Sequence, residues 1–461
     1  MIKTRDLLDG VLAEIEDGLK DDVCADALAD EFSISSVHLQ RLFKNAFNQT
    51  IGNYIRSRKL SASIKDLLYS GLNVQDIALE YGFEFEQTYI ISFKNRFGFP
   101  PGDLRRNRHM VKTTPPYPHS GLRSLYHNDF LIGNIVDEQY MNDEHFNIIK
   151  GHFGVITPEN NLKPVFLAPA NRGGAYNWDQ GDQMVNRILE KGLPVHGHVL
   201  VYSMQSRDWL ASGTRAEAED NLKNYITDVL THYKGRIFSW DVVNEAMRDN
   251  MSAADAAGDW RKCLYDGAHW FQKLGADYIE IAYRTAREAD PDVTLYYNDY
   301  DMANQNKAEA VRKMIHDINS RYKTETGQDR NLIEGLGIQS HYRINGFNEN
   351  NARSSLRKFA SLNIELSISE LDVSTGGYED TVGTIGRDIV IPDSVAAEQA
   401  RIYDRLFRLY REYASRIRRV TMWGIDDYNS WWSPGNPCLF DRYLNPKKAF
   451  NSVFNPEKNV K

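Results

Sequence analysis

Two short apolar runs of the sequence each end in a glutamate, and this pattern has the clearest chemical meaning in the chain. The run FSWDVVNEA places Glu245 after Asn244, and IELSISELDV places Glu370 125 residues later (370 minus 245). Each run predicts a buried parallel strand, and packing alone explains an acid at its C-terminal end poorly, because such ends open onto the active-site face of an α/β barrel. Two such acids predict glycoside hydrolysis, in which one carboxyl protonates the leaving oxygen while the other attacks the sugar carbon or activates water.

Eight short β-rich runs from Asp129 onward supply the elements that would position these acids. They are FLIGNIV, FGVITPEN, PVHGHVLVY, FSWDVVNE, TLYYNDY, GLGIQSHY, NIELSISELDV and VTMWGIDD, with helical stretches between them. This alternation predicts an α/β fold, the (β/α)8 TIM barrel. A single polar residue at a strand end often only caps a helix, but capping does not explain its repetition over most of the runs. The strand-end residues are Glu159, Asn160, His198, Asn244, Glu245, Asn298, Asp299, Gln339, His341, Glu370 and Asp372.

Several motifs extend this pattern over residues 128–452. In order they are TPENNLKP, GH followed by VLVY, WDVVNEA, LYYNDYD, GIQSHY, ISELDV, WGIDDYNSW and LFDRYLNPKKAF. The region closely resembles glycoside hydrolase family 10, the endo-β-1,4-xylanases. The resemblance implies that Glu245 on strand four is the general acid/base and Glu370 on strand seven the nucleophile of a retaining enzyme, with carboxyls about 5–5.5 Å apart. It implies no cofactor and no metal.

The same resemblance implies which residues bind the sugar. Asn244 would hydrogen-bond the 2-hydroxyl, and His341, with Gln339 nearby, would orient the nucleophile and keep it ionised. Further polar residues would contact the sugar beside the cleaved bond and the next sugar out, and tryptophans would stack on the apolar faces of the rings. These are, in that order, Lys163 and His198, then Glu159 and Asn160, then Trp423 and Trp431.

The chain departs from the family at one place near the cleaved sugar. Tyr202 and Ser203 stand where the family typically has a Trp-His pair. Tyr202 keeps a smaller aromatic surface and adds a hydroxyl, whereas Ser203 loses an imidazole. Three consequences stay open: slow hydrolysis, a preference for a decorated or different sugar, or a site that binds better than it cuts.

The first 110 or so residues have helical patterns and few strand signals. ALADEFSISSVHLQRLFKNAF and VQDIALEYGFEFEQTYIISFKNRFGFPPGDLRR each predict two helices around a turn, and a long amphipathic helix joins them. The whole chain has a formal net charge of −8, but the part from Phe32 to Lys112 has 12 Lys+Arg against 6 Asp+Glu, a net of +6. A whole-chain sum therefore hides a local basic region, which is typical of nucleic-acid binding.

The motifs LQRLFK, RKLSASIKDLL, VQDIALEYGF and SFKNRFGFPP closely resemble the DNA-binding domain of AraC-type transcriptional regulators, over nearly all of residues 10–108. This implies that helices near residues 36–45 and 86–95 enter successive major grooves of double-stranded DNA, roughly 34 Å apart. Ile90 and Ile91 replace polar or basic residues of the family, so they could meet thymine methyls, pack against the other domain, or belong to a helix that touches only phosphate. The candidate DNA contacts are His38, Gln40, Arg41 and Lys44 on the first helix, and Thr88 and Lys94 on the second.

Length and composition set the domain organisation. At 461 residues with 42% hydrophobic content, the chain predicts more than one domain. We assign residues 1–110 to the helix-turn-helix domain, 111–127 to a linker that begins with the proline-rich VKTTPPYPHSG, and 128–455 to the barrel. Three cysteines without CxxC spacing indicate neither a disulfide framework nor a structural zinc site. We expect a cytoplasmic protein with no signal peptide and no membrane partner, and its oligomeric state stays open, a dimer included.

Two main hypotheses for the whole chain follow. In the first, an intracellular retaining endo-1,4-β-xylanase, acting on xylan or xylo-oligosaccharides, is fused to a sequence-specific DNA-binding module of a transcription regulator. In the alternative, the barrel is a xylo-oligosaccharide sensor with little or no hydrolysis. A third hypothesis makes the N-terminal helices a docking module that binds no specific DNA. The presence of both acids favours the first, and Tyr202-Ser203 favours the second.

Overall fold

The computed structural model describes residues 4–47, 49–97, 99–107, 121–126, 128–376 and 390–454. The chain divides into two compact units. The first comprises Met1–Leu125, Thr375–Asp404 and Asp426–Lys461, and the second comprises Tyr126–Ser374 and Arg405–Ile425. Most of the predicted linker, namely residues 111–120 and residue 127, lies outside the described residues. The domain boundaries given above therefore stay predictions.

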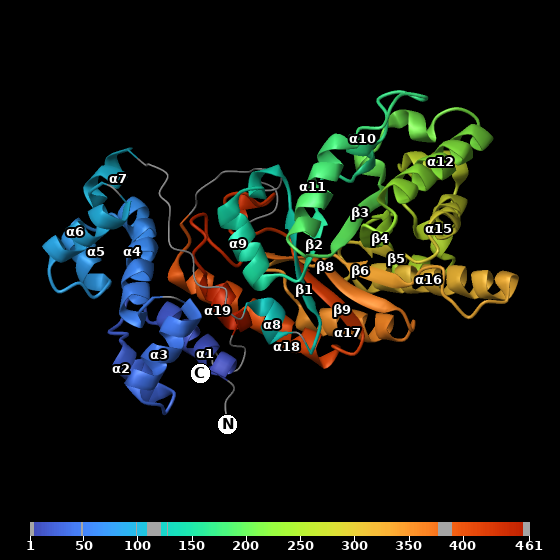
Figure 1. Ribbon diagram of the computed structural model, residues 1–461. Helices are drawn as coiled ribbons and strands as arrows, with labels where there is room; N and C mark the ends of the chain where they lie inside the picture. The colour runs from blue at the N-terminus through green and yellow to red at the C-terminus, as the bar shows by residue number, and fades with distance from the viewer. Residues whose placement is uncertain are drawn as a thin grey trace. The chain divides into compact units, whose positions relative to one another are not determined.

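The second unit is a closed barrel of parallel strands, which confirms the predicted TIM barrel (Figure 1). The strand order is β6-β5-β4-β3-β2-β1-β9-β8, and β8 also pairs with β6, which closes the ring. A short additional strand, β7, follows β6 and pairs with the end of β8. The strands are β1 (Leu131–Val136), β2 (Val155–Pro158), β3 (Val195–Val201), β4 (Ile237–Asn244), β5 (Thr294–Asp299), β6 (Gly335–Ile338), β7 (His341–Arg343), β8 (Glu365–Ser374) and β9 (Ile417–Met422).

Helices cover the outside of the barrel, so the strands are buried on both faces and read as nearly continuous apolar runs. Amphipathic spacing explains why these helices form: Ile279, Ala282, Tyr283 and Ala286 recur every three or four residues and are buried. The helices between or beside the strands are α9 (Asp143–His152), α10 (Pro164–Leu167), α11 (Asp179–Glu190), α12 (Arg215–Tyr233), α13 (Ala253–Ala257), α14 (His269–Leu274), α15 (Asp277–Ala289), α16 (Gln305–Thr326) and α17 (Glu349–Ala360), with 3-10 turns at Glu138–Tyr140, Ser203–Gln205, Asp208–Ala211 and Trp260–Cys263. Helix α18 (Asp393–Glu412) begins in the first unit and belongs to the second from Arg405 onward.

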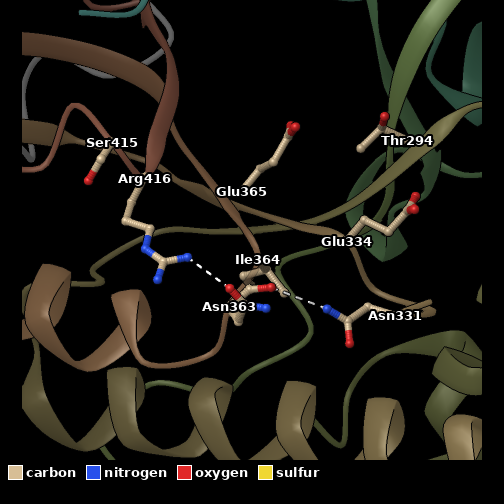
Figure 2. A pocket seen from close by; sticks show the side chains of 8 residues that line it. All are labelled: Thr294, Asn331, Glu334, Asn363, Ile364, Glu365, Ser415 and Arg416. Atoms are coloured by element: carbon tan, nitrogen blue, oxygen red, sulfur yellow. Dashed lines mark hydrogen bonds between the residues drawn. The ribbon is translucent and has the colours of Figure 1, made fainter. Parts of the chain in front are cut away.

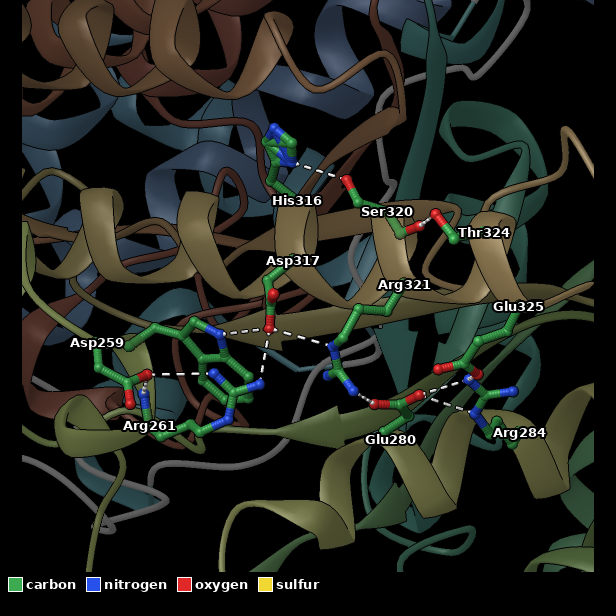
Figure 3. Close-up of polar contacts among 11 residues, drawn as sticks. Asp259, Arg261, Glu280, Arg284, His316, Asp317, Ser320, Arg321, Thr324 and Glu325 are labelled. Carbon is green, nitrogen blue, oxygen red and sulfur yellow. Dashed lines mark hydrogen bonds and ion pairs between the residues drawn. The ribbon is translucent and has the colours of Figure 1, made fainter.

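A chain of ion pairs joins two of these helices (Figure 3). Asp317 of α16 accepts hydrogen bonds from Trp260 Nε1 at 3.0 Å and from Arg261 Nη2 at 2.8 Å. Further along α16, Arg321 Nη1 pairs with Glu280 of α15 at 2.6 Å, and Arg284 pairs with the same carboxylate. These groups are partly exposed, so each pair contributes about 0–1 kcal/mol. Their main effect is to fix α15 and α16, the helices that flank β5.

The described residues in the N-terminal part of the first unit form the helices α1 (Thr4–Asp17), α2 (Ala25–Glu31), α3 (Ser36–Phe47), α4 (Ile51–Tyr69), α5 (Val74–Glu80), α6 (Glu86–Phe97) and α7 (Pro101–Asn107). In Figure 1, α4 runs between the two groups of helices. It contributes Ile51 and Tyr54 to one apolar cluster and Leu60 and Ile64 to another. This arrangement matches the two predicted helix pairs and the long helix that joins them.

Local chemistry explains where these helices begin and turn. Ser35 Oγ accepts a hydrogen bond from the backbone N–H of His38 at 3.3 Å, so Ser35 caps α3. Gly82 has φ of 69° in the turn between α5 and α6, a conformation that glycine adopts at little cost. On α6, Ile90 packs partly against the second apolar cluster, whereas Ile91 is exposed.

The first unit also contains α8 (Leu122–Leu125), a 3-10 turn at Ser433–Gly435 and α19 (Lys448–Phe454). Among the described residues, no helix is long and apolar enough to cross a membrane.

Candidate active site

The two glutamates lie at the C-terminal ends of barrel strands. Glu245 directly follows β4, where its φ of 54° lies in the left-handed region, and its N–H donates to the carbonyl of Asn298 at 2.9 Å. A non-glycine residue in that region is uncommon and persists where its surroundings fix it, frequently at functional sites. Glu370 lies in the long strand β8, two residues past Ile368, where the pairing of β8 with β6 ends, and it is buried. The barrel therefore carries both acids at one face.

Three amide side chains link the two carboxyls through hydrogen bonds. Gln339 Nε2 donates to Glu245 Oε1 at 3.0 Å and contacts Asn244 Oδ1 at 3.2 Å. Asn298 Nδ2 donates to the same Asn244 oxygen at 2.9 Å and to Glu370 Oε1 at 2.7 Å. The orientation of each acid is therefore coupled to that of the other. Gln339, which was predicted only to lie near His341, thus contacts the expected acid/base directly.

Asn298 is held by its own neighbours. Its Oδ1 accepts a hydrogen bond from Ser369 Oγ at 2.6 Å, and its side chain is fully buried. A Cβ at Gly337 of β6 would lie 2.2 Å from Asn298 Oδ1. Glycine is therefore required at position 337 to leave room for this amide. Asn298 was visible in the sequence as a strand-end polar residue, but it was not among the predicted site residues.

His341 connects Glu370 to a second carboxylate. Its Nε2 lies 3.1 Å from Glu370 Oε2, and its Nδ1 lies 2.9 Å from Asp372 Oδ1. Burial lowers the pKa of His341, but the charges of and hydrogen bonds to Asp372 and Glu370 outweigh it and raise the pKa to about 10. At neutral pH the imidazole is therefore protonated and donates to both carboxylates. This fixes the orientation of Glu370.

Glu245 has the opposite environment. Burial raises its pKa, and the negative charges of Glu370 and Asp299 add to this effect, while interactions with Gln339 and Tyr202 oppose it. Glu245 therefore keeps its proton to a higher pH than an exposed glutamate would. An acid catalyst must still hold its proton at the pH of the reaction. A raised pKa on one of two neighbouring carboxyls meets this requirement.

The loop after β2 adds a polar cluster. Lys163 Nζ donates to Asn160 Oδ1 at 2.9 Å, and Asn160 Nδ2 donates to Asp137 Oδ2 at 2.8 Å. Burial raises the pKa of Glu159 to about 7, against the nearby charge of Lys163. Burial also lowers the pKa of Lys163, whose charge is felt by Glu159, Glu370 and Glu245. These contacts bring the predicted polar sugar-binding residues of this loop together with the two acids.

His198 and Trp423 complete the cluster. His198 Nδ1 lies 2.9 Å from Asp241 Oδ2. The ring of Trp423, which follows β9, lies edge-on to His198 and to His341, with centroids 5.6 and 6.3 Å away. Trp423 is only 6% exposed, so packing accounts for most of its surface. Tyr202 follows β3 and interacts with Glu245.

The second unit thus brings together eleven of the predicted catalytic and sugar-binding residues. They are Glu159, Asn160, Lys163, His198, Tyr202, Asn244, Glu245, Gln339, His341, Glu370 and Trp423. Trp431 belongs to the first unit, where it is partly exposed and its ring lies 5.6 Å from that of Trp432. Within the described residues, no group of three or more His, Cys, Asp or Glu side chains could hold a metal ion.

A polar cavity of about 390 Å³ lies at the opposite ends of the strands (Figure 2). Arg416 Nη1 donates to Asn363 Oδ1 at 2.9 Å across its wall. The cavity lies where β5, β6, β8 and β9 begin, so it is separate from the two acids. It is lined by Thr294, Asn331, Glu334, Asn363, Ile364, Glu365, Ser415 and Arg416.

Sequence comparison with known proteins identifies the family to which this barrel belongs. Residues 121–456 match the sequence model of glycosyl hydrolase family 10. The chain belongs to glycosyl hydrolase family 10. The matched region confirms the resemblance predicted from the motifs, and it contains both acids. Residues 28–107 match a helix-turn-helix domain, which confirms the second resemblance.

The relatives include several proteins named xylanases, and one that is named exoglucanase XynX, from Acetivibrio thermocellus. A beta-1,4-xylanase of Dictyoglomus thermophilum is 32% identical over 338 residues, covering 71% of this chain and 89% of the relative. A solved family 10 xylanase from termite gut that contains a bacterial Ig-like domain is 33% identical, with a TM-score of 0.68 over 73% of this chain and 77% of that one. The solved intracellular xylanase TsXylA of Thermoanaerobacterium saccharolyticum is 30% identical, with a TM-score of 0.62 over 72% and 97%. Several other relatives are much longer, and the chain spans only 29%, 31% and 32% of their length.

The candidate DNA contacts lie outside the family 10 region, on α3 and α6. On α3, Arg41 is exposed, and its Nη2 lies 3.2 Å from Nδ1 of the partly exposed His38. The other four candidates are also exposed: Gln40 and Lys44 on α3, and Thr88 and Lys94 on α6. All six are therefore accessible on their helices, and their contacts to DNA stay predictions.

Replacing Asn298 with alanine tests the amide chain. A hydrogen bond to a charged group contributes about 1.5–3 kcal/mol, so we expect kcat to fall by about 10- to 100-fold with little change in KM. Steady-state kinetics on an aryl xylobioside measure this. Asn319→Ala is the matched control, because Asn319 of α16 is also buried and bonded, to the backbone of Ile333. Equal losses of kcat in both variants would show that Asn298 acts only through stability.

Proposed function

We propose that this chain is a retaining endo-1,4-β-xylanase that acts inside the cell on xylan or xylo-oligosaccharides, joined to a sequence-specific DNA-binding module that regulates transcription. The observation that carries the enzymatic part is the linked pair of acids. Glu245 has a raised pKa, and Glu370 is held by a protonated His341. Most names of the cited relatives, which are xylanases apart from one exoglucanase, support xylan as the substrate class.

The proposed reaction has two steps. In the first, Glu245 donates its proton to the glycosidic oxygen while a Glu370 oxygen bonds to the anomeric carbon, so the carbon–oxygen bond to the leaving sugar breaks. In the second, Glu245 takes a proton from water, whose oxygen attacks the anomeric carbon and displaces Glu370. The pKa of Glu245 falls between the steps, because esterified Glu370 no longer carries the negative charge that raises it.

The remaining site residues are proposed to bind and orient the sugars. Asn244 would hydrogen-bond the 2-hydroxyl of the sugar attacked by Glu370, and the amides of Gln339 and Asn298 keep its oxygen occupied so that its N–H₂ faces the substrate. The proposed polar contacts are Lys163, His198, Glu159 and Asn160, and the proposed ring-stacking residues are Trp423 and Trp431.

Product analysis with xylohexaose tests this function. The purified full chain should release shorter xylo-oligosaccharides, and proton NMR should show the β-anomer first, since two displacements at one carbon retain its configuration. Initial release of the α-anomer would contradict the retaining mechanism. Binding of xylohexaose without any product would instead support the sensor hypothesis, which the Tyr202-Ser203 pair favours.

The DNA-binding part rests on the helix-turn-helix match and on the exposed polar faces of α3 and α6. Because DNA lies inside the cell, a module of this kind supports an intracellular location for the whole chain. The intracellular xylanase among its structural relatives is consistent with such a location for a family 10 enzyme.

Arg41→Ala should weaken DNA binding. Loss of one phosphate or base contact is expected to raise the dissociation constant by about 10-fold, and loss of a phosphate contact also lowers the slope of log K against log salt by about 1. Fluorescence anisotropy over a salt series measures both quantities. Arg215→Ala on α12 removes the same charge from the barrel and should change neither quantity. Equal behaviour of the two variants would contradict a role for α3 in DNA binding.

A further inference from the structure

We propose that Arg442 is the link through which sugar bound at Trp431 alters DNA binding by the second helix-turn-helix motif. This inference rests on the proposed function of both parts, and it adds the regulation of one by the other. It concerns the C-terminal segment, Asp426–Phe454, which lies in the same compact unit as helices α1–α7.

The first part of the C-terminal segment is an ordered loop that carries Trp431. Asp426 Oδ1 accepts hydrogen bonds from the backbone N–H groups of Tyr428 and Asn429 at 3.0 and 3.1 Å. Trp432 is buried, whereas Trp431 is partly exposed. Tyr428 and Trp431, three residues apart, therefore belong to one hydrogen-bonded loop, so a shift of this loop by a sugar ring stacked on Trp431 also moves Tyr428.

Arg442 bridges this loop to the DNA-binding helices. Its guanidinium carbon lies 4.3 Å from the ring centroid of Tyr428 and 5.3 Å from that of Tyr443. Tyr443 in turn packs against the apolar cluster that contains Tyr89 and Phe93, the buried side chains of α6. Contact is thus continuous from the Trp431 loop, through one guanidinium, to the core beneath the second recognition helix.

The turn that holds Arg442 is anchored to α4, so it cannot absorb a displacement of the loop. Arg58 of α4 is fully buried, pairs with Glu16 of α1 at 2.7 Å, and donates from Nη1 to Asn445 Oδ1 at 3.0 Å. Asn445 Nδ2 donates to Asp441 Oδ2 at 3.1 Å, and Asp441 Oδ1 accepts from the N–H of Tyr443 at 2.8 Å. Leaving a buried charge unpaired is strongly unfavourable, so this anchor persists.

A second set of contacts, made by Lys447, holds the two ends of the loop together. Lys447 Nζ contacts both oxygens of Asp427, at 2.8 and 3.1 Å, and donates to the carbonyls of Asn436 and Cys438. Arg58 and Lys447 hold the turn and the base of the loop in place. A shift of the loop driven by bound sugar therefore changes the contact between Arg442 and Tyr428. A sugar that alters this contact changes the affinity for DNA. By thermodynamic linkage, bound DNA then changes the affinity for the sugar by the same factor.

The experiment uses the full chain carrying Glu245→Gln, so that xylohexaose is not consumed. The DNA probe is a labelled duplex enriched from a random-sequence pool by binding to the full chain. Its dissociation constant is measured at fixed salt with and without saturating xylohexaose. We expect the sugar to change this constant by about 5-fold or more, the lower end of coupling between sites.

The variants Arg442→Met and Tyr428→Leu, each added to Glu245→Gln, should abolish the effect of xylohexaose while retaining both binding activities. Two variants are used because each removes one side of the same contact, so either one that folds decides the question. Arg442→Lys keeps a cation between the rings and should preserve part of the effect. Arg187→Met is the matched control, since Arg187 lies 5.0 Å from the ring of Phe146 in the barrel unit, and it should leave the effect intact.

The outcomes separate this inference from the proposed function. Sugar and DNA binding that are each measurable but independent would overturn the coupling and leave the proposed function standing. An effect of xylohexaose that persists in either Arg442→Met or Tyr428→Leu, provided that the variant folds, would overturn the role of Arg442. Failure of the parent chain to bind either xylohexaose or any enriched duplex would overturn the proposed function and this inference with it.

Discussion

Replacing Glu370 with alanine is expected to abolish hydrolysis of an aryl xylobioside, with kcat falling by about 10⁵-fold or more, the scale seen when a catalytic nucleophile is removed. Without this carboxylate no glycosyl intermediate can form. The protonated His341 and the amide of Asn298 also lose their common partner. The release rate of the aryl group, corrected for spontaneous hydrolysis, measures the loss.

Glu365→Gln is the matched control for this prediction, because Glu365 begins the same strand at its opposite end and lines the cavity in Figure 2. Its kcat should stay within about 2-fold of the parent, as for substitutions away from a site. Added azide should restore turnover of Glu370→Ala and give a product of inverted configuration, since azide then attacks the anomeric carbon from the nucleophile's side. A residual rate within about 100-fold of the parent would exclude Glu370 as the nucleophile.

Replacing Glu245 with alanine is expected to have an effect that depends on the leaving group. Cleavage of xylohexaose should fall by about 10²- to 10⁴-fold, the contribution of a general acid. Dinitrophenolate leaves without being protonated. With a dinitrophenyl xylobioside, formation of the glycosyl intermediate should therefore survive, while its hydrolysis by water slows. A burst of dinitrophenolate equal to the enzyme concentration, seen by stopped-flow absorbance, is the expected signature. Equal slowing of both substrates without a burst would contradict the acid/base role.

The pH profile gives a second measure of Glu245. The acid must be protonated for the first step, so the parent rate should fall as pH rises through the pKa of Glu245. Burial raises that pKa above the ordinary 4.5, which moves this fall to a higher pH than an exposed glutamate would give. The same shift means that the protonated carboxyl's contribution to stability is present at low pH and is lost as pH rises through the raised pKa. In Glu245→Ala with the dinitrophenyl substrate, the alkaline fall in the first step should disappear.

Much of the site could be predicted from local sequence. Glu245 and Glu370 stand out because a charged residue at the end of a buried strand has no packing explanation, and the eight β-rich runs place both at one face of a barrel. The helix-turn-helix units were equally visible, since turn residues such as Gly82 and apolar residues at helical spacing act over only a few positions. Such signals are local, so they do not depend on how the chain closes.

Other features could not be predicted, because they depend on contacts between residues that are far apart in the sequence. Asn298 joins Asn244 to Glu370 only because β5 pairs with β4 and is separated from β8 by the single strand β6 in the closed barrel. Gln339 contacts Glu245 because β6 and β4 both pair with β5, so the residues that follow these two strands meet at the same end of the barrel. The role of Gly337 follows from the same closure, since its missing Cβ makes room for Asn298.

The sequence by itself determined the chemistry available to this protein: two carboxyls at strand ends, the residues that bind sugar in its family, and helices suited to DNA. Residue identity and local periodicity are enough for this, since strands, helices and turns form from short-range preferences and burial patterns. Only the tertiary structure decided which groups touch. It raised the pKa of Glu245 by burial, protonated His341 between two carboxylates, and placed Arg442 between Tyr428 and Tyr443. Each of these depends on desolvation and on distances that the folded chain alone sets.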